Sequence, residues 1–452
     1  MLTIYISNLS EDVWPFICSF SNEDLRQAEI EDNINTCDRD LFALSHFNDL
    51  LCILPKPVSR SFLAYYQQVC GRRQVECFHP KAHSGSICDD IRLDQELFRN
   101  LVGTARSVGR VRLISYCYSR QFKELALALA EAGVDYVTPE APLPGSEWVV
   151  DFYGSKSGIR QLVSKAQGAG FNIKMPEGYV FSDIQAACAY GAQRYVQKGG
   201  LAFKTNRGHA GAGVLIFRPG DLPAEVEKAR QALLQYLSRE KYWQMFPIVV
   251  EDYVDLDPSI SGGSPSIEYC VVETGEPCCL YPCAMRVSPE GVFQGVEINY
   301  QALPEGVTRA MEEAGTFISR EYARAGYRGY FDIDFMAAKD GTLYVGESNV
   351  RRTGGTHAYY LARHLVGSDF LRSSYVIANN CFPLPVQAGP TPGFEELLEL
   401  LSPLAFRAET KEGLILTSEH KLSQKQIAFV IIAPTRGRAF DIEHNMLVLL
   451  GK

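Results

Sequence analysis

The stretch GYFDIDFMAAKDGTLYVGESNVRRTGGTH at residues 329–357 decides the fold. Two β-forming runs flank Asp340-Gly341, a dipeptide typical of a two-residue hairpin turn. Because side chains alternate along a strand, the spacing predicts that the polar side chains of both runs share one face. The predicted turn places them opposite one another in two pairs, Asp334 with Glu347 and Asp332 with Asn349.

A hairpin face with opposed carboxylates needs a positive charge, because like charges directly opposite one another destabilise a sheet. A hard divalent cation meets that need. Carboxylate and amide oxygens suit Mg²⁺ or Mn²⁺, with water and phosphate oxygens completing the coordination shell. We therefore predict Asp334, Glu347 and Asn349 as metal ligands. The alternative is a solvated face of an edge hairpin.

A glycine-rich segment, FKTNRGHAGAG at 203–213, is a second candidate site. Its lysine can supply a charge for phosphate oxygens, and its glycines let backbone amides approach an anion closely. The segment lacks the Gly-Lys-Ser/Thr of a Walker loop and leads into another strand, so an ordinary glycine-rich hairpin is the alternative. For the histidine, the alternative is a structural role. The candidate nucleotide-binding residues are Lys204, Gly208, His209, Gly211 and Gly213.

An apolar run, PIVVEDYVDLD at 247–257, ends in acidic residues. Such a junction can present backbone groups to a purine edge and a carboxylate to a ribose. It indicates Glu251, Val254 and Asp257 as further candidate nucleotide-binding residues. Taken alone, the pattern also fits a strand that leaves the core.

The composition is that of an ordinary globular protein, and the length suggests about three folding units. The chain has 452 residues, 46% of them hydrophobic, with 44 Lys+Arg against 53 Asp+Glu. The formal net charge of −9 argues against a broad nucleic-acid or anionic-membrane footprint. The segment MLTIYISNLSEDVWPF has no basic start, and the longest apolar runs are strand-sized. We expect a cytoplasmic protein without nucleic-acid or membrane partners.

Thirteen cysteines, an odd number in a chain without secretory features, indicate mostly reduced and buried thiols. The segment 70–88 also concentrates zinc-type ligands, but their spacing matches no standard paired-cysteine pattern. Metal binding is the less favoured interpretation for Cys70, Cys77, His79, His83 and Cys88.

Hydrophobic periodicity and proline clusters divide the chain into four regions. Strand-like runs at 50–58 and 110–119 and a helical run at 120–133 predict an α/β region that ends at a proline-rich passage. The tail, after a second such passage, contains one helix, two strands and a terminal helix. The predicted regions are an α/β domain at 1–148, a lobe with the glycine loop at 149–250, a lobe with the hairpin at 251–385, and a small C-terminal domain at 386–452.

In their order along the chain, these motifs resemble those of the ATP-grasp ligases. The matching residues are Lys156, Lys204 with its glycine loop, Glu251, Asp334, Glu347 and Asn349. The span of the last three is similar to the magnesium triad of D-alanine:D-alanine ligases. More narrowly, SKSGIRQL, ESNVRRTGGTH, an N-terminal segment like a pre-ATP-grasp domain and a small C-terminal extension resemble the pheganomycin-type peptide ligases. The resemblance covers nearly the whole chain.

The resemblance implies an α/β (α+β) architecture, the ATP-grasp fold, in which two α+β lobes clasp ATP behind an α/β pre-ATP-grasp domain. It implies ATP and Mg²⁺ (or Mn²⁺) as ligands. Lys156 and Lys204 would contact phosphates, the amides of 208–213 would cover them, Glu251 would be the hinge acid, and the backbone of Val254 would meet adenine. The run after the metal triad would hold the carboxylate substrate or acyl phosphate: Arg351, Arg352, Thr353, Gly354, Gly355 and Thr356.

One departure concerns an arginine that D-alanine ligases carry two residues before the first metal-binding acid, where this chain has Asp332. Stabilisation of the tetrahedral intermediate then falls to another cation, for which Arg352, Arg351 and Arg286 are the candidates. A structural ion pair is the alternative for Arg286. His357 could help to deprotonate the amine, with a structural role as the alternative.

The activity implied by the resemblance is carboxylate–amine ligation. An acyl phosphate forms, ADP and phosphate are released, and an amide or peptide bond results, in small-molecule or peptide natural-product biosynthesis. The substrates would be a small-molecule or peptide carboxylate and an amino-acid or peptide amine, and a homodimer is the assembly considered. The alternatives are a ligase joining an amino acid to a vinylogous acid, as in mycosporine biosynthesis, and a catalytically dead nucleotide sensor.

Overall fold

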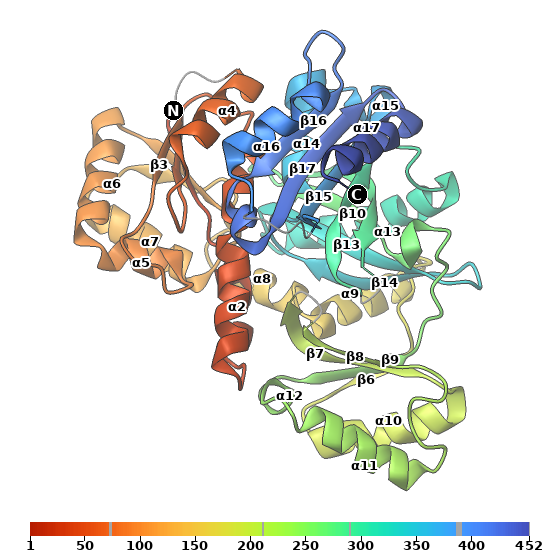
Figure 1. Ribbon diagram of the computed structural model, residues 1–452. Helices are drawn as coiled ribbons and strands as arrows, with labels where there is room; N and C mark the ends of the chain where they lie inside the picture. The colour runs from red at the N-terminus through yellow and green to blue at the C-terminus, as the bar shows by residue number, and fades with distance from the viewer. Residues whose placement is uncertain (72–74, 210–211, 289–290, 386–390, 452) are drawn as a thin grey trace.

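The computed structural model describes residues 1–71, 75–209, 212–288, 291–385 and 391–451, which form three β-sheets with helices packed against them (Figure 1). The sheets have five, eight and four strands. Each belongs to a different part of the chain, and the predicted site residues come from the second and third.

The N-terminal sheet is parallel, with the strand order β3-β2-β1-β4-β5. Its central strands are buried, as the apolar sequence LLCI of β2 requires in a sheet covered on both faces. The carboxyl ends of β1 and β4 lie side by side where the strand order reverses, the usual ligand position in such sheets. The strands are β1 (Thr3–Ile6), β2 (Leu50–Ile53), β3 (Val75–Phe78), β4 (Val111–Ser115) and β5 (Tyr136–Val137). The helices are α3 (Asp40–Ala43), α4 (Arg60–Cys70), α5 (Ile87–Leu93), α6 (Gln95–Val108) and α7 (Arg120–Glu131).

The eight-stranded sheet is antiparallel and has the order β14-β13-β10-β11-β12-β15-β17-β16. Its strands are β10 (Pro265–Val271), β11 (Pro277–Val287), β12 (Phe293–Ile298), β13 (Gly329–Ala337), β14 (Leu343–Asn349), β15 (Tyr375–Pro383), β16 (Gly413–Ser418) and β17 (Gln426–Ala433). The helices of this region are α13 (Glu305–Arg324), α14 (Thr356–Val366), α15 (Phe370–Ser373), α16 (Phe394–Leu401) and α17 (Arg436–Leu449).

This sheet crosses the predicted boundary at 385/386. The prediction made 386–452 a separate small domain, whereas β17 and β16 continue the sheet beyond β15. The reason is that the apolar strand QIAFVIIA, nearly all buried, pairs with β15 on one side and β16 on the other. Its apolar faces are therefore covered within the large lobe.

The four-stranded sheet forms the small lobe, with the order β6-β9-β7-β8. Helices α10 and α11 pack against this sheet (Figure 1). The elements are β6 (Gly178–Phe181), α10 (Ile184–Lys198), β7 (Leu201–His209), β8 (Ala212–Phe217), α11 (Val226–Leu237), α12 (Tyr242–Met245) and β9 (Ile248–Asp252). The glycine-rich segment thus connects two strands, as its sequence predicted.

Helices α8 (Trp148–Tyr153) and α9 (Lys156–Gly168) fall in the range predicted for the small lobe but pack in the core of the large lobe. There Ile159 and Leu162 lie among the residues buried under β13 and α13. Each fully buried aliphatic side chain contributes about 1.5–3 kcal/mol to that packing. The apolar face of α9 therefore anchors this segment to the hairpin that carries the predicted metal ligands.

In the hairpin β13–β14, the strand pairing near the predicted metal ligands is as predicted. The turn that joins the two strands differs from the prediction. Asp332 pairs with Asn349 and Asp334 with Glu347, as the sequence predicted. The two-residue turn was wrong: the Ala338 amide donates to Thr342 O, which leaves three residues in the loop. A bulge after Asp334 places one extra residue in β14, which restores the predicted register beyond it.

The segment before α3 leaves the N-terminal domain and packs on the small lobe. It comprises α1 (Trp14–Ile17) and α2 (Glu23–Ile34), the latter reaching towards the four-stranded sheet (Figure 1). Phe16, which is fully buried, lies 5.1 Å from the ring of Tyr242 and 6.2 Å from that of Phe246. The N-terminal segment therefore packs against the small lobe that carries the glycine hairpin.

Candidate active site

The predicted metal ligands lie together on the hairpin face. The Asn349 side-chain amide donates to Asp334 Oδ2 (3.1 Å) and to Asp332 Oδ1 (2.9 Å). The other carboxylate oxygen of Asp334 is buried and has no hydrogen-bond donor among the described residues. A buried anionic oxygen without a donor is costly, so this arrangement fits a bound cation.

The electrostatics of the face also fit a cation. Burial and the adjacent Glu347 raise the pKa of Asp334 to about 7. Lys156 is the main reason that the pKa of Glu347 is lowered to about 2, with Lys204 and Arg351 contributing. Without a metal ion, Glu347 is therefore ionised at neutral pH, whereas Asp334 is only partly ionised.

Two lysines converge on this face from different elements. Lys156 begins α9, whose N-terminus is capped by Ser155, and its Nζ lies 3.0 Å from Glu347 Oε2. Lys204 lies on β7 and pairs with Glu251 of the adjacent strand β9. Both lysines are largely buried, so they are held in place and can neutralise phosphate charge without reorganisation.

Glu251, the predicted hinge acid, is 2% exposed and binds two cations. Besides Lys204 it accepts a hydrogen bond of 2.5 Å from Arg160 of α9. It therefore joins the small-lobe sheet to the helix that carries Lys156. Val254 lies in the segment after β9, and Asp257 accepts hydrogen bonds from the backbone and hydroxyl of Ser259.

The glycine hairpin approaches its neighbours closely. A Cβ on Gly213, which has φ +80°, would lie 2.5 Å from Thr205 Oγ1 and 3.3 Å from the Phe16 ring. Gly208 has a similar constraint from a backbone carbonyl of β8. For His209 only the strand position is described, and Gly211 lies outside the described residues. A backbone that approaches its neighbours this closely, without side chains in between, suits a loop that covers phosphates.

Of the three candidate arginines, Arg351 is hydrogen-bonded to Asn349, which lies beside Asp332 and Asp334 on the hairpin. It donates to Asn349 Oδ1 (3.2 Å) and to Asp12 Oδ2 of the N-terminal region (2.7 Å). Arg352 is 1% exposed, donates to Glu140 (2.6 Å) and lies 4.0 Å above the Tyr330 ring.

Arg286 forms the structural ion pairs that were the alternative interpretation for this residue. Its guanidinium donates to Glu297 of β12 (3.0 Å) and to Glu443 of α17 (2.5 Å). These bonds tie the terminal helix to the large-lobe sheet. Among the described residues, Arg351 is the candidate arginine that forms a hydrogen bond with a predicted metal ligand, Asn349.

The predicted substrate loop surrounds one buried carboxylate. Glu268 of β10 accepts hydrogen bonds from the hydroxyls of Thr353 (2.8 Å), Thr356 (2.6 Å) and Tyr281. Gly354 O accepts from Asn380 (2.9 Å), and Gly355 lies against Tyr281. Burial lowers the pKa of His357 well below its usual value, with the nearby Arg39 charge as the second cause. The ring is therefore neutral in this environment.

Sequence reasoning missed several residues that shape the site. Asp12 holds Arg351, and its backbone carbonyl accepts from Arg207 of the glycine hairpin (3.3 Å). Phe16 lies against Gly213. Asp12 and Arg351 are separated by 339 positions, and no local pattern signals such a pair.

The cysteine and histidine side chains of segment 70–88 lie in separate environments. His83 bonds Asp90 (2.7 Å), Cys88 is buried beside Glu11, and Cys77 pairs in register with Cys52. Among the described residues, no three His, Cys, Asp or Glu side chains form a group that could hold a metal ion. At the hairpin, a metal site would need the side-chain oxygen of Asn349, which here accepts from Arg351, together with oxygens of the ligand.

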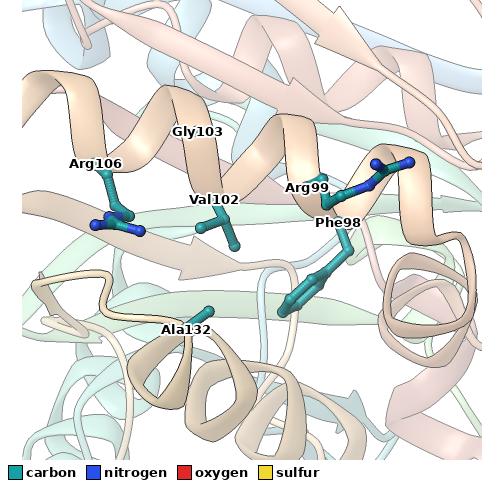
Figure 2. Close-up of a pocket in the computed structure, with 6 residues that line it drawn as sticks. All are labelled: Phe98, Arg99, Val102, Gly103, Arg106 and Ala132. Carbon is teal, nitrogen blue, oxygen red and sulfur yellow. The ribbon is translucent and has the colours of Figure 1, made fainter.

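Two surface hollows lie away from the hairpin face. One, of about 480 Å³, lies between α6 and the end of α7, where Val102 and Phe98 point towards Ala132 and Arg99 and Arg106 lie to either side (Figure 2). The other, of about 420 Å³, is lined by His46, Tyr360, Arg363 and His364. Neither is lined by a residue that the sequence predicted for the site. In the described part of the chain, no helix has the length and apolar character needed to span a membrane.

The fold was compared with known proteins. No family model and no curated protein sequence matches the chain. A solved structure of Campylobacter jejuni biotin carboxylase in complex with β,γ-ATP aligns with a TM-score of 0.58 at 12% identity, covering 99% of this chain and 91% of that one. N5-carboxyaminoimidazole ribonucleotide synthetase from Thermus thermophilus aligns with a TM-score of 0.54 at 15% identity, covering 100% and 99%.

The chain has the ATP-grasp fold. The predicted fold class is thereby confirmed, including the α/β domain that precedes the two lobes. A further ATP-grasp structure, N5-carboxyaminoimidazole synthase from Aspergillus clavatus with ADP and 5-aminoimidazole ribonucleotide, aligns with a TM-score of 0.53 at 12% identity over 99% of this chain and 98% of that one. At these identities the likeness concerns the fold, and the chemistry must be argued from the residues of the site.

Proposed function

We propose that the protein is an ATP-dependent carboxylate–amine ligase that releases ADP and phosphate. The observation that carries the proposal is the convergence of Lys156, Lys204 and Arg351 on the opposed acids of the hairpin. Such a site can accept a nucleoside triphosphate with its metal ion, because it offers both cations for the phosphates and anions for the metal.

Asp334, Glu347 and Asn349 would hold Mg²⁺ or Mn²⁺. When bound, the ion neutralises charge on the phosphate oxygens as the phosphoryl group is transferred. The lysines orient the phosphates, and the backbone of the glycine hairpin covers them. In this first step a carboxylate oxygen of the substrate bonds to the γ-phosphorus of ATP, the bond to the ADP oxygen breaks, and an acyl phosphate forms.

In the second step the amine attacks the acyl carbon and phosphate leaves. The negative charge on the tetrahedral oxygen needs a cation, and we assign this role to Arg351, whose hydrogen bonds to Asp12 and Asn349 support the assignment. Acyl phosphates hydrolyse in water, so the covering glycine hairpin also protects the intermediate. The reaction needs no side-chain nucleophile.

The finer assignment is a peptide-bond-forming ligase similar to the pheganomycin type, acting in small-molecule or peptide natural-product biosynthesis. Its support is the motif order and the loop 353–356, which follows the metal hairpin directly and is held rigidly by Glu268. A fixed glycine turn beside Arg351 can receive an extended carboxylate substrate.

The test is ADP release by the full-length protein with Mg²⁺ and ATP over a matrix of carboxylic acids and amines. We expect full turnover only when both partners are present. With the active acid labelled with ¹⁸O in its carboxylate, one label should appear in the released phosphate, because the acyl phosphate oxygen leaves with phosphorus. ATP binding without ADP release for every pair would support a nucleotide sensor and overturn the proposal.

A further inference from the structure

A short connector, residues 8–17, leaves the carboxyl end of β1 and contacts three parts of the molecule. It contains a 3-10 helix (Leu9–Val13) and α1. At its start, the side-chain amide of Asn8 donates to Cys117 O (3.0 Å), and the side-chain oxygen accepts from Cys117 N (3.1 Å). Because Cys117 lies just after β4, these two bonds fix the start of the connector where the strand order of the parallel sheet reverses.

A buried carboxylate fixes the middle of the connector. Glu11 is 4% exposed. Its carboxylate accepts hydrogen bonds from the Ser119 hydroxyl (2.6 Å), the Cys88 amide (2.8 Å) and the Asn8 side chain (2.9 Å). Displacement of the 3-10 helix would leave this buried charge without its donors, which is costly. The helix is therefore firmly attached to the N-terminal domain, and Asp12, the next residue, is held with it.

Asp12 lies between two arginines from different lobes. Its carboxylate accepts from Arg351 of the large lobe (2.7 Å), and its backbone carbonyl accepts from Arg207 of β7 in the small lobe (3.3 Å). Arg207 also donates to Asp151 of α8 (2.5 Å), and both arginine side chains are largely buried. One residue therefore contacts the arginine assigned to the amine step and the strand that carries Lys204.

The end of the connector is inserted into the core of the small lobe. Phe16 and Ile17 are fully buried among residues of that core, with the Phe16 ring 5.1 Å from the ring of Tyr242. The four residues from Asp12 to Phe16 span at most about 14 Å, even when fully extended. A displacement of the small lobe that keeps Phe16 buried must therefore act on Asp12.

We propose that Asp12 is a positioning residue that couples the small lobe to Arg351. This inference rests on the proposed function, in which Arg351 meets the charge on the tetrahedral oxygen. Arg351 is oriented for the amine step only while β7 lies against the connector and Arg207 supports Asp12. The amine therefore reacts beneath a small lobe that is in place, which limits loss of the acyl phosphate to water.

The first test needs no turnover. Hydrogen exchange of the full-length protein is followed by mass spectrometry in peptides covering 9–13 and 201–209, with and without Mg²⁺ and a non-hydrolysable ATP analogue. We expect the analogue to slow exchange at least threefold in both segments of the wild type. Arg207→Met should keep the protection of 201–209 and lose that of 9–13. The control is Asp135→Asn, which breaks an exposed Asp–Arg pair of the N-terminal domain and should behave as the wild type.

The second test follows amide formation and ADP release with the substrate pair found in the ligase assay. Asp12→Asn weakens the hold on Arg351, and Arg207→Met removes the contact from β7. We expect each to slow amide formation about tenfold and to raise the ADP released per amide, with KM for ATP changed less than twofold. The double variant should lose no more than the slower single variant, because both act through Arg351. Arg207→Lys keeps the charge and should recover part of the loss.

The two tests separate the two proposals. No ADP release with any substrate pair, together with loss of the 9–13 protection in Arg207→Met, would contradict the ligase and leave the coupling through Asp12. That coupling would be overturned by protection of 9–13 that survives in Arg207→Met, or by its absence in the wild type. Additive losses in the double variant, or a change in KM for ATP alone, would also overturn the role of Asp12.

Discussion

Two carboxylate groups on neighbouring strands of the large-lobe sheet have opposite environments. On β10, Glu268 is buried and receives three hydroxyl donors, so its hydrogen-bonding capacity is largely met by the protein. On the hairpin next to it, Asp334 lies opposite Glu347 and keeps one buried oxygen without a donor. The first carboxylate organises a loop, whereas the second has room for a cation.

The difference shows how structural and functional charge can be told apart in one sheet. A satisfied buried carboxylate stabilises the folded chain, and its removal leaves donors unpaired. Opposed carboxylates repel one another, and a bound metal ion relieves that repulsion.

The largest expected effect comes from exchanging each carboxylate for an amide. Glu347→Gln should lower the rate of Mg²⁺-dependent ADP release by about 1,000-fold, because a metal-binding charge is lost. It should also lower the free energy of unfolding, because the buried Lys156 loses its partner, the carboxylate whose pKa that lysine helps to lower to about 2. Steady-state ADP assays and urea unfolding measure the two quantities.

The matched change, Glu268→Gln, should leave the Mg²⁺ dependence of ADP release in place. We expect the free energy of unfolding to fall by about 2 kcal/mol, because one amide nitrogen would face hydroxyl donors. If Glu347→Gln retained full ADP release, the metal assignment of the hairpin would be wrong.

A second effect on stability tests the ion pair between Arg352 and Glu140. Arg352→Met should lower the free energy of unfolding by about 3 kcal/mol, since Glu140 would lose its buried partner. The double variant with Glu140→Met should recover much of that loss. Chemical denaturation of the four proteins gives the coupling energy, and additive effects would show that the pair contributes little.

The smallest effect is a pH dependence. The pKa of Asp334 is raised from 3.8 to about 7 in the folded protein, so its contribution to stability is present below pH 4 and is lost as pH rises towards 7. Metal binding needs the ionised form and should strengthen about tenfold from pH 6 to pH 8. Mg²⁺ titrations and unfolding curves at several pH values measure both trends. An Asp334→Asn variant should show neither, and unchanged trends in that variant would contradict the role of Asp334.

Local sequence was enough to predict the hairpin and the order of the motifs. The Asp334–Glu347 and Asp332–Asn349 pairs follow from strand alternation, and the prediction was right even though the turn has one more residue, because the bulge compensates. The placement of α9 in the large lobe was not predictable, because the sequence of its apolar face is equally suited to packing on the small lobe or on the large lobe.

By itself, the sequence determined which residues could carry charge to phosphates and metal, because a period of two and a glycine-rich connection are local properties of the chain. Tertiary structure alone decided which of those charges are satisfied. Arg352 and Arg286 found buried partners, and Arg351 met Asp12 across 339 positions. The physical reason is that the free energy of a charge depends on its burial and its neighbours, which come together only when the domains pack.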